Sequence, residues 1–173
     1  EYVATQTVDV PADRVVRTIA ILAKSLGAAG LVGGQIVDLA SEGDPTISLE
    51  TLHFIHRHKT AVLLEACVTA GATIAGASAD LVAKLSQYAQ DIGLAFQIVD
   101  DILDITATTA ELGKSAGKDL QAEKATFPKL YGLDGSRQKA AELIDRAKAQ
   151  LADFGAAGDP LRSIADYIVA RKN

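Results

Sequence analysis

Three carboxylates, Asp100, Asp101 and Asp104, interrupt an otherwise apolar stretch of this 173-residue chain. In a helix, which turns by about 100° per residue, these side chains and Gln97 fall within an arc of about 100°, away from the apolar face. Like charges at this spacing repel one another, by roughly 0.2–0.5 kcal/mol per solvated pair, and by more when they are buried. A compensating cation is therefore expected. Hard oxygen ligands without nearby His or Cys favour Mg²⁺, which commonly bridges carboxylates and substrate phosphates. The alternative is a solvated acidic patch on an amphipathic helix.

Helical periodicity dominates the rest of the chain, and the alternating patterns of strands are missing. Ser48 is the expected N-cap of one helical region, with Glu50 in its first turn. We predict one all-α domain over residues 1–173, without internal repeats or domain linkers. The expected helical regions cover residues 11–40, 48–76, 79–106, 135–153 and 160–171, with an irregular lysine-bearing segment at 107–126.

Composition narrows the classes of function. The net charge of −5 gives no basic surface for nucleic acid. The apolar run at 66–79 is shorter than the roughly 20 residues of a membrane span, so no span is expected. The single cysteine, Cys67, excludes an internal disulfide, fits a reducing compartment and is expected to be buried. A chain that starts at Glu1 and contains no Met is expected to be a piece of a longer product. The histidines lack the ligand pattern of a zinc site and are expected to be surface or packing groups: His53, His56 and His58.

The acidic run and its flanks resemble the second aspartate-rich motif of the trans-isoprenyl diphosphate synthases, FQxxDDxLD followed by LGK. Here the motif begins at Phe96 and its lysine is Lys114. The chain is similar to the C-terminal half to three-fifths of the short-chain geranylgeranyl diphosphate synthases of cyanobacteria and plastids. The matching stretches occur in the same order: GLVGGQIVDLASEG (30–43), HRHKTAVLLEA (56–66), GLAFQIVDDILDIT (93–106), LGKSAGKD (112–119), KATFPKLYGL (124–133) and IADYIVARK (164–172).

The resemblance implies the C-terminal part of an isoprenoid synthase helical bundle and a Mg²⁺ site. In this family two aspartate-rich motifs face each other across a helical cavity and bind Mg²⁺ together with the diphosphate of an allylic substrate. Asp100 is the implied direct ligand, whereas Asp101 and Asp104 hold metal-bound waters or orient neighbouring groups. The first aspartate motif and the GGKxxRP segment for isopentenyl diphosphate do not occur in residues 1–173. Half of the metal site is therefore expected to lie outside this chain.

The resemblance also implies which side chains contact the substrate. Lys59 matches the lysine of the family's KT pair and is assigned to the allylic diphosphate, with a solvated surface lysine as the alternative. Thr60 and Gln97 are expected to present oxygen dipoles to the developing carbocation. Lys114 is assigned to the same diphosphate, and Lys118 is a weaker candidate for it.

Gln35 and Asp38, in a segment that matches the family's GGQxxD, are expected to form part of the cavity wall. Phe96 is expected to line the same cavity. Gly33 and Gly34 precede this pair. Their small size either lets helices pack closely or leaves room for an isoprenoid tail, and both interpretations stay open.

The activity implied by the resemblance is a Mg²⁺-dependent prenyl transfer. Isopentenyl diphosphate is condensed with an allylic diphosphate to give geranylgeranyl or farnesyl diphosphate, for isoprenoid and carotenoid biosynthesis. Residues 1–173 alone are expected to be inactive. The alternatives are a non-catalytic regulatory subunit of a heteromeric prenyl synthase, usually marked by decayed motifs, and a class I terpene cyclase. We expect a homodimer formed through residues 11–106, or continued association with an N-terminal part, and a cytoplasmic location, or a plastid in a plant.

Overall fold

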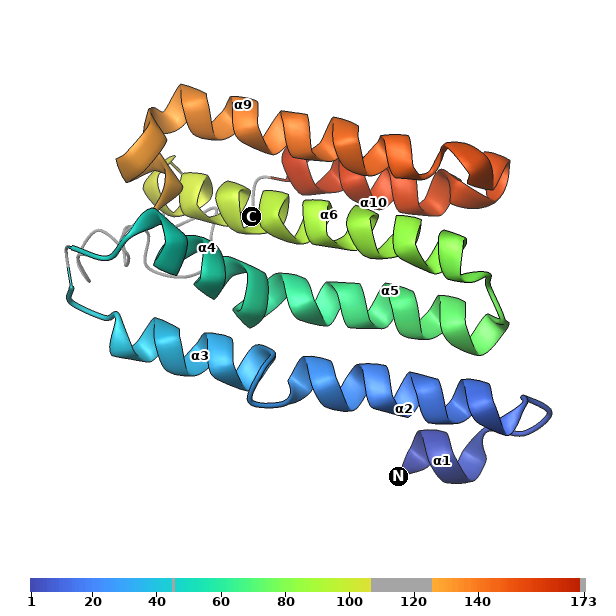
Figure 1. The fold of residues 1–173 in the computed structure, drawn as a ribbon. Helices are drawn as coiled ribbons and strands as arrows, with labels where there is room; N and C mark the ends of the chain where they lie inside the picture. The colour runs from blue at the N-terminus through green and yellow to red at the C-terminus, as the bar shows by residue number, and fades with distance from the viewer. Residues whose placement is uncertain (45, 107–125, 172–173) are drawn as a thin grey trace.

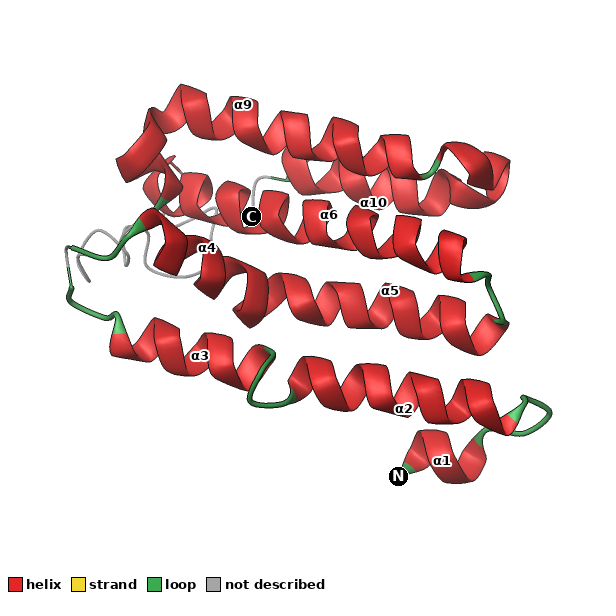
Figure 2. Ribbon diagram, in the orientation of Figure 1, coloured by secondary structure: helices red, strands yellow, loops and turns green. Residues whose placement is uncertain are grey.

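The computed structural model describes residues 1–44, 46–106 and 126–171, and all of the regular elements in these ranges are helices. Figure 2 shows the described helices in red and the described loops in green. The predicted all-α class is therefore confirmed. In chain order the elements are α1 (Tyr2–Gln6), α2 (Ala12–Leu26), α3 (Leu31–Ala40), α4 (Leu49–His56), the π-helical turn η1 (Arg57–Ala61), α5 (Val62–Ala75), α6 (Ala79–Thr106), α9 (Phe127–Gln150), the 3₁₀ segment η2 (Ala152–Gly158) and α10 (Asp159–Ala170).

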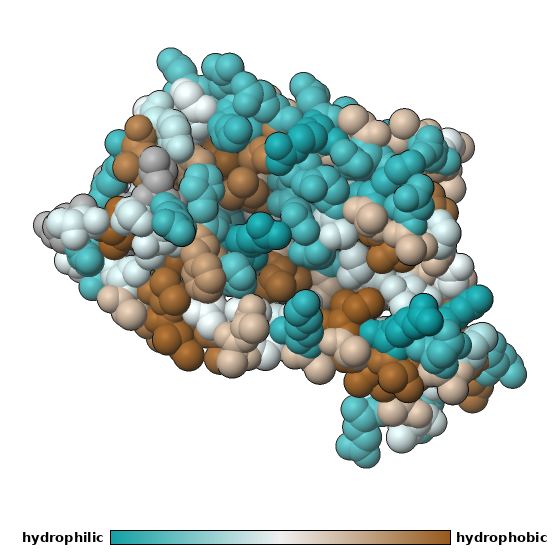
Figure 3. All heavy atoms as spheres, in the orientation of Figure 1, coloured by the Kyte–Doolittle hydropathy of each residue, from teal (hydrophilic) through white to brown (hydrophobic). Residues whose placement is uncertain are grey.

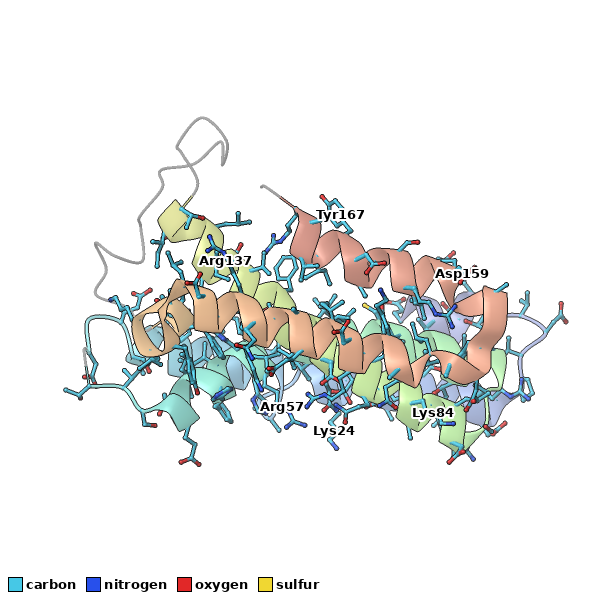
Figure 4. The ribbon with its side chains drawn as sticks, turned by 90° about the horizontal axis from the view of Figure 1, so that it is seen from above. Lys24, Arg57, Lys84, Arg137, Asp159 and Tyr167 are labelled. Carbon is cyan, nitrogen blue, oxygen red and sulfur yellow. The ribbon has the colours of Figure 1, made fainter. Side chains whose placement is uncertain are left out.

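The long helices form a layer in which each packs against the next (Figure 1). α2 packs against α5, α5 against α6, and α6 against α9. α3 follows α2 end to end along the same edge of the layer and contacts η1. α10 packs on α6 and α9. Viewed from above, α10 lies on one side of the layer (Figure 4). The layer therefore has one side that carries α10 and one side that does not.

The centre of the hydrophobic core belongs to α6, because this helix lies between α5, α9 and α10. Tyr88 of α6 is fully buried, and its hydroxyl donates to the carbonyl of Leu161 in α10 at 2.7 Å. This bond satisfies the polar end of a large apolar ring and fixes α10 against α6. Other buried residues of α6 pack against those of α9: Leu85, Ala89, Ile92, Ala95 and Ile98 with Ala140, Leu143, Ile144 and Ala147.

The boundaries of two helical regions differ from the prediction. The region expected at 11–40 is divided into α2 and α3 by a turn, in which a Cβ on Gly30 would lie 2.1 Å from the carbonyl oxygen of Ser25. α9 consists of two helices that meet at Gly132, where φ is 71° and ψ is 167°, so a short helix from Phe127 precedes the one predicted near residue 135. Glycine adopts this non-helical conformation at little cost. The predicted N-cap is confirmed, since the Ser48 hydroxyl accepts the N–H of Thr51 at 3.1 Å.

The prediction that Cys67 is buried is wrong, because its side chain is exposed. Leu63, one turn earlier on the same face of α5, is also exposed. The apolar pattern of α5 predicts a covered face, but no helix in the described part of the chain covers this one. Periodicity shows which face of a helix is apolar and does not show what packs on it.

One stretch of the described residues, Ala12–Ala40, is apolar and long enough to cross a membrane, with a mean hydropathy of 1.6. The turn at 27–30 divides it into helices of 15 and 10 residues. Each is shorter than the roughly 20 residues that a membrane-spanning helix needs. Apolar helices of soluble folds pass the same test of length and composition, so this stretch is weak evidence for a membrane span.

Candidate functional site

Lys59 lies on η1, a single π-helical turn between α4 and α5. Such turns are rare, and they occur frequently at functional sites. The Lys59 ammonium donates to the carboxylate of Asp38 in α3 at 2.6 Å. The Asp38 side chain is 13% exposed and that of Lys59 is 37% exposed. The lysine is therefore fixed by a mostly buried carboxylate but remains accessible to a ligand, unlike a freely solvated surface lysine.

Two glycines let neighbouring helices approach the backbone of this π turn. A Cβ on Gly34 of α3 would lie 2.5 Å from the backbone nitrogen of Lys59. A Cβ on Gly93 of α6 would lie 2.7 Å from the Cα of Ala61. The obstructing atoms belong to the main chain and cannot rotate away. Of the two interpretations left open for Gly34, this geometry favours close helix packing, which places Lys59 beside Asp38.

The three carboxylates of α6 have different environments. Asp100 is about half exposed, whereas Asp101 and Asp104 are buried. Asp101 accepts the backbone N–H of Phe127 at 2.9 Å, so it anchors the first residue of α9. Within residues 1–44, 46–106 and 126–171, no group of three His, Cys, Asp or Glu side chains is arranged to hold a metal ion. The described residues therefore do not converge on one metal, and Asp101 orients a neighbouring element.

A buried histidine connects this anchor to the lysine-bearing turn. His56 is the last residue of α4, and its ring stacks on Phe127 with centroids 5.5 Å apart. Its Nε2 lies 3.9 Å from the Asp101 carboxylate. Burial, and secondarily the proximity of His53, lower the pKa of His56 from 6.5 to about 4. His56 is therefore a neutral packing group at neutral pH, which agrees with the packing role predicted for it.

We expect the depressed pKa of His56 to make the fold less stable in mild acid. The unfolded chain binds this proton near pH 6.5 and the folded chain only near pH 4, so stability is full above pH 6.5 and falls as the pH is lowered toward 4. Between pH 7.5 and pH 5 the free energy of unfolding should fall by about 2 kcal/mol. Urea unfolding at the two pH values measures this loss. His56→Gln should remove most of it and His58→Gln should leave it, whereas an unchanged loss in the His56 variant would contradict the assignment.

Arg171 compensates the charge of Asp100, and the sequence analysis did not single it out. Its guanidinium lies 3.9 Å from the ring centre of Phe96. It donates to the Phe96 carbonyl at 3.0 Å and to the Asp100 carboxylate at 3.4 Å, and its side chain is 8% exposed. The repulsion within the acidic run predicted a neighbouring cation. The matched stretch 164–172 contains this arginine, but only the fold brings it across 71 residues to α6.

The remaining predicted site residues are placed as follows. Thr60 lies on η1 next to Lys59, Gln97 lies on α6 one turn after Gly93, and Gln35 lies on α3 one turn before Asp38. All three are partly buried. Lys114 and Lys118 lie outside the described residues, so their assignment to the diphosphate stays a prediction.

Comparison with known proteins agrees with this arrangement. Residues 2–157 match the polyprenyl synthetase family. The chain is 53% identical over 171 residues to a dimethylallyltranstransferase of Fischerella ambigua, covering 99% of this chain and 49% of that protein. It is 52% identical over 173 residues to a geranylgeranyl diphosphate synthase of Cyanophora paradoxa, covering 100% of this chain and 58% of that protein. The chain thus spans about half the length of the curated relatives it matches.

Solved structures share the fold. An FPP/GFPP synthase from Zymomonas mobilis is 40% identical with a TM-score of 0.77, over 91% of this chain and 52% of that one. A geranyltransferase from Helicobacter pylori, complexed with magnesium and isoprenyl diphosphate, is 28% identical with a TM-score of 0.76, over 95% of this chain and 54% of that one. Because the sequence match covers residues 2–157 and the fold agrees over nearly all of the chain, this chain belongs to the polyprenyl synthetase family.

Proposed function

We propose that the protein that carries this chain is a prenyltransferase, which condenses isopentenyl diphosphate with an allylic diphosphate and depends on Mg²⁺. The observation that carries the proposal is that the fold leaves two side chains of opposite charge accessible, Lys59 and Asp100. Lys59 is fixed at 2.6 Å from Asp38 on a π turn, and Asp100 is half exposed near the end of α6. The names of the relatives support geranylgeranyl diphosphate as the product, and those of two structural neighbours support farnesyl diphosphate.

The described residues fit Mg²⁺ in part. Asp100 offers an accessible oxygen ligand without competing His or Cys ligands, and it already attracts a cation, the guanidinium of Arg171. Further ligands must come from other residues, because the described ones supply no second open carboxylate beside it. Bound Mg²⁺ would neutralise the diphosphate as that group departs. The magnesium and isoprenyl diphosphate in the Helicobacter pylori structure support the choice of metal.

The side chains of this chain have distinct roles in the proposed reaction. Lys59 binds a diphosphate oxygen as a compact positive charge. Thr60 and Gln97 turn neutral oxygens toward the allylic carbon as its C–O bond breaks, and these weak nucleophiles do not capture the cation. The double bond of isopentenyl diphosphate then attacks this cation, which leaves a tertiary cation on the isopentenyl unit. The carbon next to that centre loses a proton to the departed diphosphate, and the electrons of its C–H bond form the new double bond.

One assay distinguishes the proposed prenyl transfer from two other functions, those of a terpene cyclase and of a regulatory subunit. The assay supplies radiolabelled isopentenyl diphosphate and an allylic diphosphate to the purified full-length protein, and separates the products by chain length. We expect labelled prenyl diphosphates from the full-length protein and none from residues 1–173 alone. Cyclic hydrocarbons without label would indicate a terpene cyclase. Stimulation of a partner synthase without intrinsic turnover would indicate a regulatory subunit, and either result would contradict the proposal.

We expect Arg171 and a divalent cation to compete for Asp100. Arg171→Gln keeps a donor for the Phe96 carbonyl but removes the positive charge, so Mg²⁺ should bind the substrate-free protein several-fold more tightly. The gain should shrink at high salt, because half-exposed charges are screened. Titration calorimetry with MgCl₂ measures the affinity directly.

Arg137→Gln is the matched control for this prediction. Arg137 pairs with Asp134 at 3.3 Å on the exposed side of α9, so removal of its charge should leave Mg²⁺ binding unchanged. An equal gain in both variants would mean that only net charge matters. Unchanged affinity in Arg171→Gln would show that the arginine does not compete with the metal.

We also propose that the protein associates through the apolar flank of α2 and α3, with a second copy or with another part of the parent protein. Val16 is 63% exposed and Ile36 is 60% exposed, and Leu26, Val32 and Leu39 are also exposed. Contiguous apolar surface of this kind marks interaction sites. Light scattering of purified residues 1–173 at micromolar concentration should show self-association, and a stable 18.0 kDa monomer would contradict it. The proposed location is the cytoplasm, or a plastid in a plant.

A further inference from the structure

A long groove runs along α5 on the side of the layer opposite α10. Its volume is about 1060 Å³, and α2 and α6 form its two edges. Its lining follows one face of α5 from Val62 to Gly76, a length of about 21 Å at 1.5 Å per residue. Figure 3 shows this side of the molecule, with hydrophilic and hydrophobic surface mixed over the middle of the layer. The groove is separate from the candidate active site, since neither Lys59 nor Asp100 lines it.

The α2 edge of the groove is positively charged. Arg14, Arg17 and Lys24 recur at intervals of three and seven residues, so they share one flank of α2 and extend over about 15 Å. Arg57 of η1 adds a fourth cation near one end. Figure 4 shows Lys24 and Arg57 projecting from the same side of the layer, away from α10. The row is too long for one small anion to contact all of it.

Most of this positive charge has no strong partner within the described part of the chain. Arg17 lies 3.7 Å from Asp13 in an exposed pair, which contributes little. Arg57 donates to the neutral amide of Gln90 at 3.4 Å. Lys24 and Arg14 form no ion pair with a described residue, although the Arg14 guanidinium lies against Gly76 at the end of α5.

The floor and the α6 edge differ from the α2 edge. Glu65 is the acid on the floor, and its carboxylate is held by the hydroxyl of Ser86 at 2.5 Å and the amide of Gln90 at 3.0 Å. The α6 edge carries no charge. Small and apolar side chains make up most of the remaining lining: Ala20, Ile21, Val62, Ala77, Val82 and Ala83. The floor on α5 is mixed, with Val62, Glu65, Thr69 and Thr73, and most of the apolar residues lie toward the two edges. A complementary ligand is therefore elongated, amphipathic and acidic along the side that faces α2.

We propose that this groove binds an acidic amphipathic helix of a partner protein. The apolar stripe of that helix packs between the two edges, against Ile21, Val62 and Val82, and its carboxylates, spaced three or four residues apart, lie along the cations of α2. The length of the groove matches about four turns of helix. A flat membrane surface does not reach the recessed floor, and a free phosphate or diphosphate engages only one end of the cationic row. These features favour a helix over either of those ligands.

The test uses two synthetic peptides of about 18 residues, five turns of helix, that share one apolar stripe. One carries Glu and the other Lys on the flank beside the stripe. An environment-sensitive fluorophore is attached to full-length protein at Ala83→Cys in a Cys67→Ser background, which places it on the groove. The matched control carries the fluorophore on the native Cys67, which is exposed but does not line the groove.

We expect the acidic peptide to change the fluorescence at position 83 with a Kd below about 100 µM, and to bind at least about tenfold more tightly than the basic peptide. The combined Lys24→Glu and Arg57→Glu variant should lose at least about tenfold in affinity, while Arg137→Glu should not. Circular dichroism confirms that each variant is folded, and its prenyltransferase rate should match that of the parent.

Several results would overturn the proposal. One is the absence of peptide binding, and another is equal binding of the two peptides. A fluorescence change at Cys67 instead of position 83, or full affinity in the charge-reversed variant, would also overturn it. Displacement of the peptide by an equal concentration of inorganic diphosphate would identify a small-anion site. Preferential binding of vesicles rich in anionic lipid, by the same row of cations, would identify a membrane contact, and both results would also reject a helix.

Discussion

Replacing Asp100 by Ala in the full-length protein is expected to lower turnover by about 10²–10³-fold or more, while the fold survives. Asp100 is the one half-exposed carboxylate of the described acidic run, so it is the side chain best placed to share a cation with a diphosphate. Stability should change little. The variant loses a 3.4 Å contact to Arg171 but also relieves repulsion from Asp101 and Asp104. Steady-state kinetics and urea unfolding measure the two effects separately.

A second variant and a second readout sharpen this prediction. Asp134→Ala removes an exposed carboxylate whose ion-pair partner among the described residues is Arg137, at 3.3 Å on α9, so turnover should stay near that of the parent. Asp100→Glu keeps the charge and should shift the Mg²⁺ concentration that supports half-maximal rate. Near-normal turnover of Asp100→Ala, at every Mg²⁺ concentration, would rule out this carboxylate as a metal ligand.

Adding a single methyl group at Gly34 is expected to damage both folding and catalysis. In Gly34→Ala the new Cβ would lie 2.5 Å from the Lys59 nitrogen and 2.6 Å from the carbonyl carbon of His58. Both atoms are main-chain atoms, so α3 or η1 must move. Overpacking of this kind costs about 1–3 kcal/mol. A shift of about 1 Å in a substrate-positioning group can cost about 10²-fold in rate, and Lys59 is that group in the proposed reaction.

Gly71→Ala is the matched control for Gly34→Ala. Gly71 also lies inside a helix, α5, but a Cβ there would meet no atom within 4 Å. Its replacement should stabilise the protein by about 0.5–1 kcal/mol, since alanine favours helix. The two variants should therefore shift urea unfolding in opposite directions. Equal gains in stability and unchanged kinetics would show that the contact between Gly34 and the π turn is not tight.

The sequence by itself determined the helical class and the family resemblance, and it named candidate residues for the site. The helical class could be predicted because it depends on short segments of sequence. Apolar residues at a spacing of three to four favour a helix, whatever that segment packs against. Asp100 could be named because it interrupts an apolar run, whereas Lys59 and Asp38 were named through the motifs of the family that the chain resembles. The N-cap at Ser48 was likewise predictable, since a capping hydroxyl and the N–H that it bonds are only three residues apart.

The tertiary structure alone decided how these groups are used. Asp100 and Asp101 are adjacent in the chain, yet one faces Arg171 from the C-terminal end and the other anchors Phe127. The break between α2 and α3 and the π turn at Lys59 also escaped prediction. The π turn is packed against Gly34 of α3 and Gly93 of α6, which are distant in the chain, whereas the break is a turn in which Gly30 lies against the main chain of Ser25. A sequence pattern records the polarity of each helical face, but the partner that satisfies a charge or covers an apolar face is set by residues far away in the chain.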